Sequence, residues 1–311
     1  MERDSSDMLT IDTGMFGQPE TTAVYLHAGR LTVLIDTGPR STVERVLDGL
    51  AAASVESVDW IVLTHVHLDH AGAAGTLARR FPGARFAVHR RGARHLASPE
   101  RLWESVSTVY GRAAAEELWG GVDPVPEDRI RPVDDGDRLE LGDLVLRAVA
   151  TPGHAPHHHA LLDEGSGVAY VGDALGVRLP DAGTYDAATP PPDFQYETAL
   201  RSVERVRGLG AASLWLSHFG PADAGTAPLD VDAACDAAAD ALRRWREWTL
   251  AALRDGGAGG AEAAVVEGVM RRARAALPPS MDEGTRRRVE TATSYRVNVA
   301  GILADLRRAD R

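Results

Sequence analysis

The chain has 311 residues, of which 44% are hydrophobic, enough to build the core of one large domain or of two smaller ones. Its 34 basic residues, all of them arginine, stand against 45 acidic ones, and the net charge of −11 argues against nucleic acid as a partner. The single cysteine, Cys235, excludes an internal disulfide and suits the reducing cytoplasm, where we expect the protein to reside.

The chain begins with an acidic, polar segment, residues 1–7, with no apolar stretch behind it, and no later apolar run is long enough to span a bilayer. We therefore expect neither secretion nor a membrane partner. Residues 9–12 and 22–26 are predicted strands joined by a glycine-containing loop. On that loop, Met15 and Phe16 could cover an apolar substrate or fold back onto the core.

A third predicted strand, residues 31–35, ends at Asp36. A carboxylate at the end of a strand can cap the turn, or it can accept a hydrogen bond from a metal-bound histidine and fix the orientation of that ring. We predict the second role for Asp36. A helix over about residues 41–53, with apolar residues on one face, leads to the next strand.

Three histidines and a carboxylate stand between a predicted buried strand, residues 60–63, and a predicted helix, residues 71–78: His65, His67, Asp69 and His70. In an extended segment His65 and His67 point to the same side, while the turn that follows swings the other two elsewhere. Imidazole with carboxylate and no thiolate is a ligand set for zinc, with iron or manganese as weaker candidates. The motif can therefore serve two adjacent metals.

Three further predicted strands also end in residues that bind metals. The strand 144–149 leads into the turn Pro152-Gly153, which would hold His154 in a fixed place. The strand that begins at Val168 ends at Asp173, and because a buried carboxylate without a cation is costly, Asp173 would bridge two metals. His218 follows the last strand. Ligands at the ends of four strands are expected when a site gathers at one edge of the sheets.

The residues around these ligands have less certain roles. His158 is predicted to form a hydrogen bond near the site, whereas His157 and His159 are interpreted as part of a strand. The segment 175–193 is too long for a simple connection, so we predict that it rims the active site, with Arg178 and Tyr185 as substrate contacts.

Alanine-rich segments near the C-terminus predict three helices, residues 231–254, 261–277 and 282–308, separated by the glycine-rich residues 256–260 and by Pro278-Pro279. These helices could lie over the metal site as a lid or form the interface of a homodimer. Amphipathic helices pack more often against their own domain, which favours the lid.

The order of the motifs resembles that of the metallo-β-lactamase superfamily over residues 8–222: His65-Val66-His67-Leu68-Asp69-His70, Gly153-His154, Gly172-Asp173 and Ser217-His218. The resemblance implies an α/β fold, a four-layer αβ/βα sandwich with the metals at one edge between two sheets. Residues 1–225 would form this catalytic domain and residues 226–311 a helical extension.

The resemblance also implies two zinc ions. One would be held by His65, His67 and His154, the other by Asp69, His70 and His218, with Asp173 as the bridge. The likeness is closest to glyoxalase-II-like and thioesterase-like members. The chain has no lysine to match the basic residues that glyoxalase II uses for glutathione.

Two divalent metals lower the pKa of a bridging water from about 15.7 towards 7 and polarise a carbonyl. The main hypothesis is hydrolysis of an ester, thioester or lactone by metal-bound hydroxide, on a small-molecule or carrier-bound acyl substrate. Asp69 and Asp173 are the predicted catalytic carboxylates, and Asp69 could receive the proton once the tetrahedral intermediate forms. The alternatives are phosphodiester hydrolysis at the same metals, oxygen chemistry at a single iron as in persulfide dioxygenases, and a binding role without catalysis.

Overall fold

The computed structural model describes residues 8–225, 228–255 and 262–309. Two segments interpreted above, residues 1–7 and the glycine-rich residues 256–260, lie outside this part of the chain. None of the helices in the described ranges is long and apolar enough to cross a membrane.

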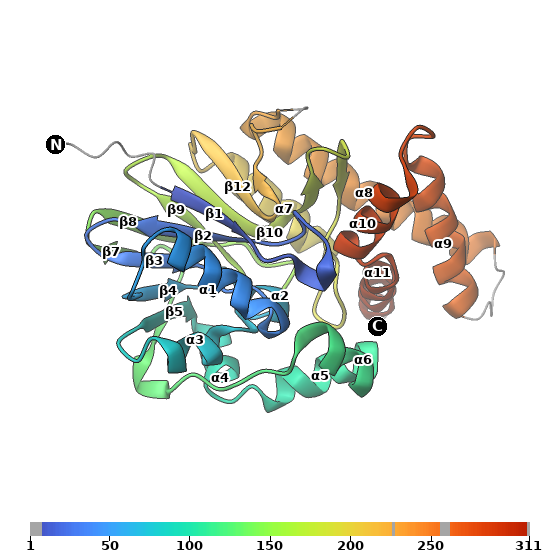
Figure 1. Ribbon diagram of the computed structural model, residues 1–311. Helices are drawn as coiled ribbons and strands as arrows, with labels where there is room; N and C mark the ends of the chain where they lie inside the picture. The colour runs from blue at the N-terminus through green and yellow to red at the C-terminus, as the bar shows by residue number, and fades with distance from the viewer. Residues whose placement is uncertain (1–7, 226–227, 256–261, 310–311) are drawn as a thin grey trace.

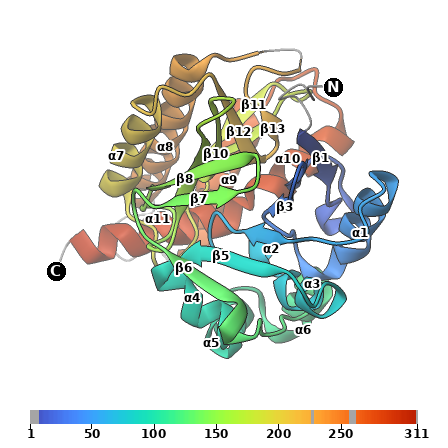
Figure 2. The same cartoon turned by 90° about the vertical axis from the view of Figure 1, so that its left-hand side faces the viewer.

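Two β-sheets lie face to face at the centre of the molecule, and helices cover the outer face of each (Figure 1, Figure 2). In the described residues the first sheet contains, in spatial order, β1 (Met8–Asp12), β2 (Ala23–Ala28), β3 (Thr32–Ile35), β4 (Trp60–Val62), β5 (Arg85–His89) and β6 (Ile130–Val133). From β3 to β6 neighbouring strands are parallel, and β1 and β2 pair antiparallel at the other side of the sheet.

The second sheet contains, in spatial order, β13 (Gly220–Pro221), β12 (Ser213–His218), β10 (Val168–Leu179), β9 (His159–Asp163), β8 (Leu144–Ala150) and β7 (Arg138–Leu141), with β11 (Thr184–Asp186) paired to β10. β10 and β12 are parallel, and β9 is antiparallel to both β10 and β8. The C-terminal ends of β8, β10 and β12 therefore meet at one edge of the sheet.

The outer helices are divided between the two sheets. Those on the first sheet and beside it are α1 (Val43–Ala52), α2 (Leu68–Ala71), α3 (Ala74–Arg80), α4 (Arg90–Ala97), α5 (Glu100–Tyr110) and α6 (Arg112–Trp119), with short 3-10 turns η1 (Met15–Gly17), η2 (Arg40–Thr42) and η3 (Glu127–Arg129). Those on the second sheet and beyond it are α7 (Tyr196–Arg207), α8 (Val231–Asp255), α9 (Glu262–Ala276), α10 (Glu283–Thr293) and α11 (Tyr295–Ala309).

Alternation along the strands explains the layers. On β3, Val33 and Ile35 pack between the two sheets, and Leu34 packs outward against the helices of the first sheet. Successive strand residues point to opposite faces, so a strand buried on both faces is apolar throughout. Between the sheets, Tyr25 contacts the rings of Tyr170 and Trp215. The expected four-layer αβ/βα sandwich is confirmed.

The C-terminal helices share one apolar cluster with the second sheet. Trp245 of α8 and Val299 of α11 belong to the same buried cluster as Val171 and Leu216 in the sheet. The predicted helix 282–308 is in fact two helices, because Ser294 adopts a left-handed conformation (φ 51°) that separates α10 from α11. Likewise, the predicted loop 175–193 begins inside β10 and contains β11, so only its later part is irregular.

Candidate metal centre

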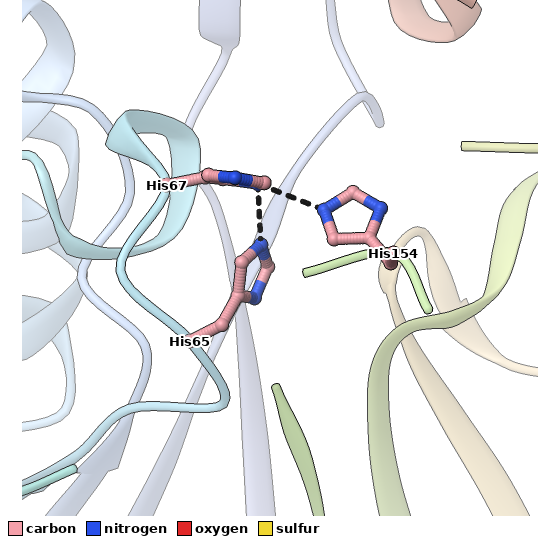
Figure 3. A group of neighbouring side chains, drawn as sticks. All are labelled: His65, His67 and His154. Atoms are coloured by element: carbon pink, nitrogen blue, oxygen red, sulfur yellow. Dashed lines mark hydrogen bonds between the residues drawn. The ribbon is translucent and has the colours of Figure 1, made fainter. Parts of the chain in front are cut away.

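Three imidazoles converge at the edge where the strands end. His65 and His67 follow β4, and His154 follows β8 across the gap between the sheets (Figure 3). Nδ1 of His67 lies 3.1 Å from Nε2 of His65 and 2.8 Å from Nε2 of His154. Three ring nitrogens within such a distance form one face of a tetrahedral site for a metal.

A second group lies beside the first and consists of two carboxylates and two imidazoles: Asp69, His70, Asp173 and His218. Nε2 of His70 is 3.2 Å from Oδ1 of Asp173, and Nε2 of His218 is 3.3 Å from Oδ2 of Asp69. The other oxygen of Asp173, Oδ2, is 3.4 Å from Nε2 of His154 in the first group. Asp173 thus lies between the two groups, as a bridging ligand must.

The histidines are oriented through their second nitrogen. Nδ1 of His154 donates to the carbonyl oxygen of Ala188 at 3.0 Å, and Nδ1 of His218 donates to the carbonyl of Thr21. Since a carbonyl can only accept, these bonds place the proton on Nδ1 and leave Nε2 free to bind a metal.

Asp36 performs the same task for His70. Its Oδ2 accepts from Nδ1 of His70 at 2.9 Å and from the hydroxyl of Ser217 at 2.9 Å, while Oδ1 accepts from the backbone N–H of Thr64 at 2.8 Å. Asp36 is fully buried, so it cannot reach a substrate. Its position matches the predicted role of fixing a ligand's ring.

His158 holds the backbone of Asp173 in place. Its Nε2 accepts from the backbone N–H of Asp173 at 3.0 Å, and its Nδ1 lies 2.8 Å from the hydroxyl of Thr151. Gly172 makes this approach feasible: its φ is +52°, and a Cβ there would lie 2.5 Å from Nε2 of His158. The pairing of β10 with β12 shifts register at Gly172, and this bulge directs Asp173 to the sheet edge.

The charges of the site suit metal binding. Burial, reinforced by the neighbouring His154, lowers the pKa of His67 to about 3, so His67 is neutral and its lone pair is free at pH 7. Burial also lowers the pKa of His65. In the second group burial opposes ionisation of Asp69, yet the neighbouring imidazoles of His70 and His218 hold the pKa of that carboxyl well below its usual range. Asp69 is therefore an ionised carboxylate, the form that binds a metal.

Two buried atoms test whether a metal fits. Nε2 of His70 and Oδ1 of Asp173 are both without a hydrogen-bond partner in the described residues. Unsatisfied buried polar groups are costly, and nearly all of them in folded proteins find a partner. A metal ion bound between these atoms would satisfy both, so the residues of the second group fit a metal.

A cavity of about 690 Å³ opens above the two groups, and His67, Asp69, His154, Asp173 and His218 line its floor. One wall is apolar and comes from η1, α5 and α6. The other side is formed by the segment 188–193 and by α10 and α11, from Ala292 to Asn298. The C-terminal helices thus contribute directly to the cavity over the candidate metal centre.

Two of the four predicted substrate contacts line this cavity. Met15 and Phe16 are among its lining residues, and the ring of Phe16 lies 5.0 Å from that of Trp119. The prediction that Arg178 and Tyr185 contact the substrate is wrong, because neither residue lines the cavity. Arg178 is 2% exposed and donates to the carbonyl oxygens of Pro221 and Ala224, and Tyr185 packs against the apolar cluster of the second sheet.

Other lining residues were not identified from the sequence. His157, which was interpreted as part of a strand, lies 5.4 Å from His67, ring to ring. His95 lies 6.4 Å from His157. Arg91, Arg94 and Arg101 line the same side of the cavity. A signal was present in the arginine-rich run from Arg90 to His95, but such a run usually marks a solvated helix face.

The similarity to known proteins agrees with this geometry. The metallo-beta-lactamase fold-containing protein ST1585 from Sulfurisphaera tokodaii is 29% identical over 217 residues, which are 68% of this chain and 77% of the relative. A hydroxyacylglutathione hydrolase from Aeromonas salmonicida is 31% identical over 140 residues, 45% of this chain and 39% of the relative.

Among solved structures, the metallo-beta-lactamase family protein TTHA1429 from Thermus thermophilus shares the fold, with a TM-score of 0.67 and 24% identity over 98% of this chain and 94% of that one. The family model described as "Metallo-beta-lactamase superfamily" matches residues 17–218, which include every ligand of the two groups. By this match, and by the fold that carries the two groups, the chain belongs to the metallo-beta-lactamase superfamily.

Proposed function

We propose that the protein is a dinuclear metal hydrolase, with zinc as its metal, that cleaves an ester, thioester or lactone bond. The observation that carries the proposal is Asp173, a buried carboxylate whose two oxygens face different groups of histidines and whose Oδ1 has no hydrogen-bond partner in the described chain. When bound, two zinc ions would supply hydroxide at neutral pH and polarise the scissile carbonyl.

The protein's own residues would hold the two ions and transfer a proton. His65, His67 and His154 would hold one ion, and Asp69, His70 and His218 the other, with Asp173 between them. Asp69 lines the cavity and its side chain is 19% exposed, so a carboxylate oxygen of Asp69 can take the hydroxyl proton of the tetrahedral intermediate and pass it to the leaving group.

An acyl substrate is favoured by the apolar wall. Leu102, Val106 and Val109 recur at helical spacing along α5 and line the cavity, so an acyl chain can lie against them. The hydroxyacylglutathione hydrolase among the relatives is, by its name, an enzyme that acts on an acylated thiol. The substrate, whether free or bound to a carrier, would be held at its acyl end by this wall.

The first test is the metal content of freshly purified protein, measured by mass spectrometry, together with a panel of acyl thioesters, lactones and phosphodiesters on the same sample. Near two zinc ions per chain with acyl turnover is the expected result. Turnover of phosphodiesters alone would replace the proposal with a phosphodiesterase. One iron per chain, with oxygen uptake and no hydrolysis, would replace it with oxygen chemistry.

A variant separates the metal centre from the fold. Asp173→Ala should lose metal and turnover together, because the carboxylate that faces both groups is removed, while the helical circular dichroism remains. His27→Ala is the matched control, since His27 lies on β2 and pairs with Asp143 away from the cavity. Full activity of metal-free Asp173→Ala protein would refute the proposal.

A further inference from the structure

Three arginines gather on one side of the cavity, and the described residues provide none of them with an ion-pair partner. Arg91 and Arg94 are three residues apart on α4, and Arg101 lies in the first turn of α5. All three are exposed and line the cavity. Their neighbour Arg90 is engaged by Asp134, which accepts from both Nε and Nη2 of the guanidinium, but no ion pair involves Arg91, Arg94 or Arg101 in the described ranges.

This arginine cluster stands out against the charge of the chain. The protein carries a net charge of −11, yet three cations lie together facing the same cavity. Like charges in proximity repel, and nearby carboxylates would normally offset the repulsion. Burial lowers the pKa of His95, and the charges of Arg94 and Arg101 lower it further. The charge of Asp193, which also lines the cavity, raises it. One carboxylate against three guanidinium groups leaves this side of the cavity positively charged and able to bind an anion.

The cluster is also close to the candidate metal centre. The ring of His95, next to Arg94, lies 6.4 Å from the ring of His157. The ring of His157 lies 5.4 Å from the ring of His67, a candidate metal ligand. Two ring contacts therefore connect the cluster to the floor of the cavity. A molecule with its acyl bond at the metals can place another part of itself against these arginines.

The helix α5 joins two kinds of surface. Arg101 lies at its beginning, and Leu102, Val106 and Val109 follow along its cavity side, where Val109 is 42% exposed. Since the apolar residues suit an acyl chain, the basic end is available to the other part of the substrate. Guanidinium groups bind phosphates and carboxylates through paired N–H donors, which gives both affinity and orientation.

We propose that Arg91, Arg94 and Arg101 bind an anionic group, a phosphate or a carboxylate, on the thiol or alcohol part of the acyl substrate. This inference rests on the proposed acyl hydrolysis and deepens it. It makes the substrate a two-ended molecule, with an apolar acyl group along α5 and a negatively charged leaving part at the arginine cluster.

The kinetic test uses one acyl group on three thiols. Coenzyme A carries phosphates, glutathione carries carboxylates, and N-acetylcysteamine carries no charge. The variant Arg91→Ala/Arg94→Ala/Arg101→Ala should raise KM for an anionic thioester at least tenfold, which is about 1.4 kcal/mol. KM for the neutral thioester should change less than twofold. Whether the coenzyme A or the glutathione thioester responds distinguishes phosphate from carboxylate.

A charge-matched control removes three other arginines. Arg112, Arg131 and Arg254 are exposed and do not line the cavity, so replacing them with alanine lowers the net charge equally. This control should leave all three KM values within twofold. An equal effect of the cluster variant on charged and neutral thioesters, or no effect on any, would overturn the inference while acyl hydrolysis stands.

A binding experiment does not depend on turnover. Titration calorimetry of the purified protein with coenzyme A, glutathione and N-acetylcysteamine compares two charged thiols with a neutral one. At least one charged thiol should bind ten times more tightly than the neutral one, and the advantage should vanish in the cluster variant and shrink in high salt. If the wild-type protein binds all three equally, the inference fails whatever the outcome of the hydrolysis assays.

Discussion

Asn298 on α11 holds Thr189, a residue of the cavity rim, through two hydrogen bonds. The backbone N–H of Thr189 donates to Oδ1 of Asn298 at 2.8 Å, and the hydroxyl of Thr189 donates to the carbonyl of Asn298 at 2.9 Å. The amide of Asn298 also donates to the carbonyl of Ala187 at 2.6 Å. Between these two anchored residues, the carbonyl of Ala188 accepts from Nδ1 of His154. The C-terminal helix thus fixes the backbone that orients a candidate metal ligand.

Replacing Asn298 with alanine should therefore weaken the metal centre although the residue touches no ligand. Loss of the two side-chain bonds leaves buried polar groups of residues 187 and 189 unpaired, which costs about 1–3 kcal/mol of stability. Loosening of the group that holds a ligand should reduce metal affinity or kcat about tenfold. Chelator competition and steady-state kinetics measure both quantities.

The control for this prediction lies on the same helix. Arg296 is exposed and pairs with Glu267, so Arg296→Ala should leave metal affinity and kcat unchanged. If Asn298→Ala loses stability but keeps wild-type metal affinity and kcat, then Asn298 supports the fold alone.

Asp36→Asn tests the bond that orients His70. Asp36 has a φ of +61°, a conformation that asparagine tolerates nearly as well as aspartate, so the backbone should be retained. The variant loses the negative charge next to Nδ1 of His70, and we expect metal affinity to fall about 10- to 100-fold. The measurement is competition with a chromophoric chelator.

Ser217→Ala serves as the comparison for Asp36→Asn. It removes only one of the donors to Asp36 and leaves its bond to His70 intact, so its effect on metal affinity should be several times smaller. Equal losses in the two variants would mean that the charge of Asp36 is not what orients His70.

The ends of three strands could be predicted from the sequence, and with them three candidate metal ligands, whereas β10 continues past Asp173 to Leu179. Residues such as Val33 to Ile35 are apolar without interruption because both faces of their strand are buried, and such runs are recognisable locally. His65, His154 and His218 each stand at or just past the end of such a run. The parallel direction of β10 and β12 then brings their ends together.

What could not be predicted depends on contacts between distant segments. Arg178 was expected at the rim, but β10 continues past its bulge and takes Arg178 into bonds with Pro221 and Ala224. The break at Ser294 has no glycine or proline to mark it. Arg94 has the pattern of an ordinary solvated helix face, and only the packing of α4 beside the cavity distinguishes it.

His159 should make the protein less stable in mild acid. Burial lowers its pKa to about 4, and its Nε2 donates to the carbonyl of Leu63. In the unfolded chain the ring binds a proton at its ordinary pKa near 6.5, so between about pH 6.5 and 4 the unfolded state binds more protons than the native state. The contribution of His159 to stability should therefore fall by about 2 kcal/mol from about pH 7 to pH 5.

Denaturant unfolding at the two pH values tests this for His159→Gln, which retains a donor near the carbonyl of Leu63 and cannot be protonated. On acidification the free energy of unfolding of the variant should fall by about 2 kcal/mol less than that of the wild type. A parallel decline of wild type and His159→Gln would show that His159 is protonated in the native state.

Cys235 should be inert in the native protein, and the proposed mechanism requires this. The residue is fully buried on α8, and burial raises the pKa of its thiol to about 12. At pH 8 about one thiol in ten thousand would then be ionised, whereas an ordinary cysteine, with a pKa near 8.5, is about one-quarter ionised. Because the thiolate is the nucleophile, a thiol reagent should label the native chain extremely slowly and the unfolded chain once.

Hydrolysis at the candidate metal centre should survive long exposure to iodoacetamide, since that centre contains no thiol. Cys235→Ser, unlabelled even when unfolded, is the control for the labelling. Rapid alkylation of the native protein with parallel loss of turnover would instead place a cysteine in the reaction.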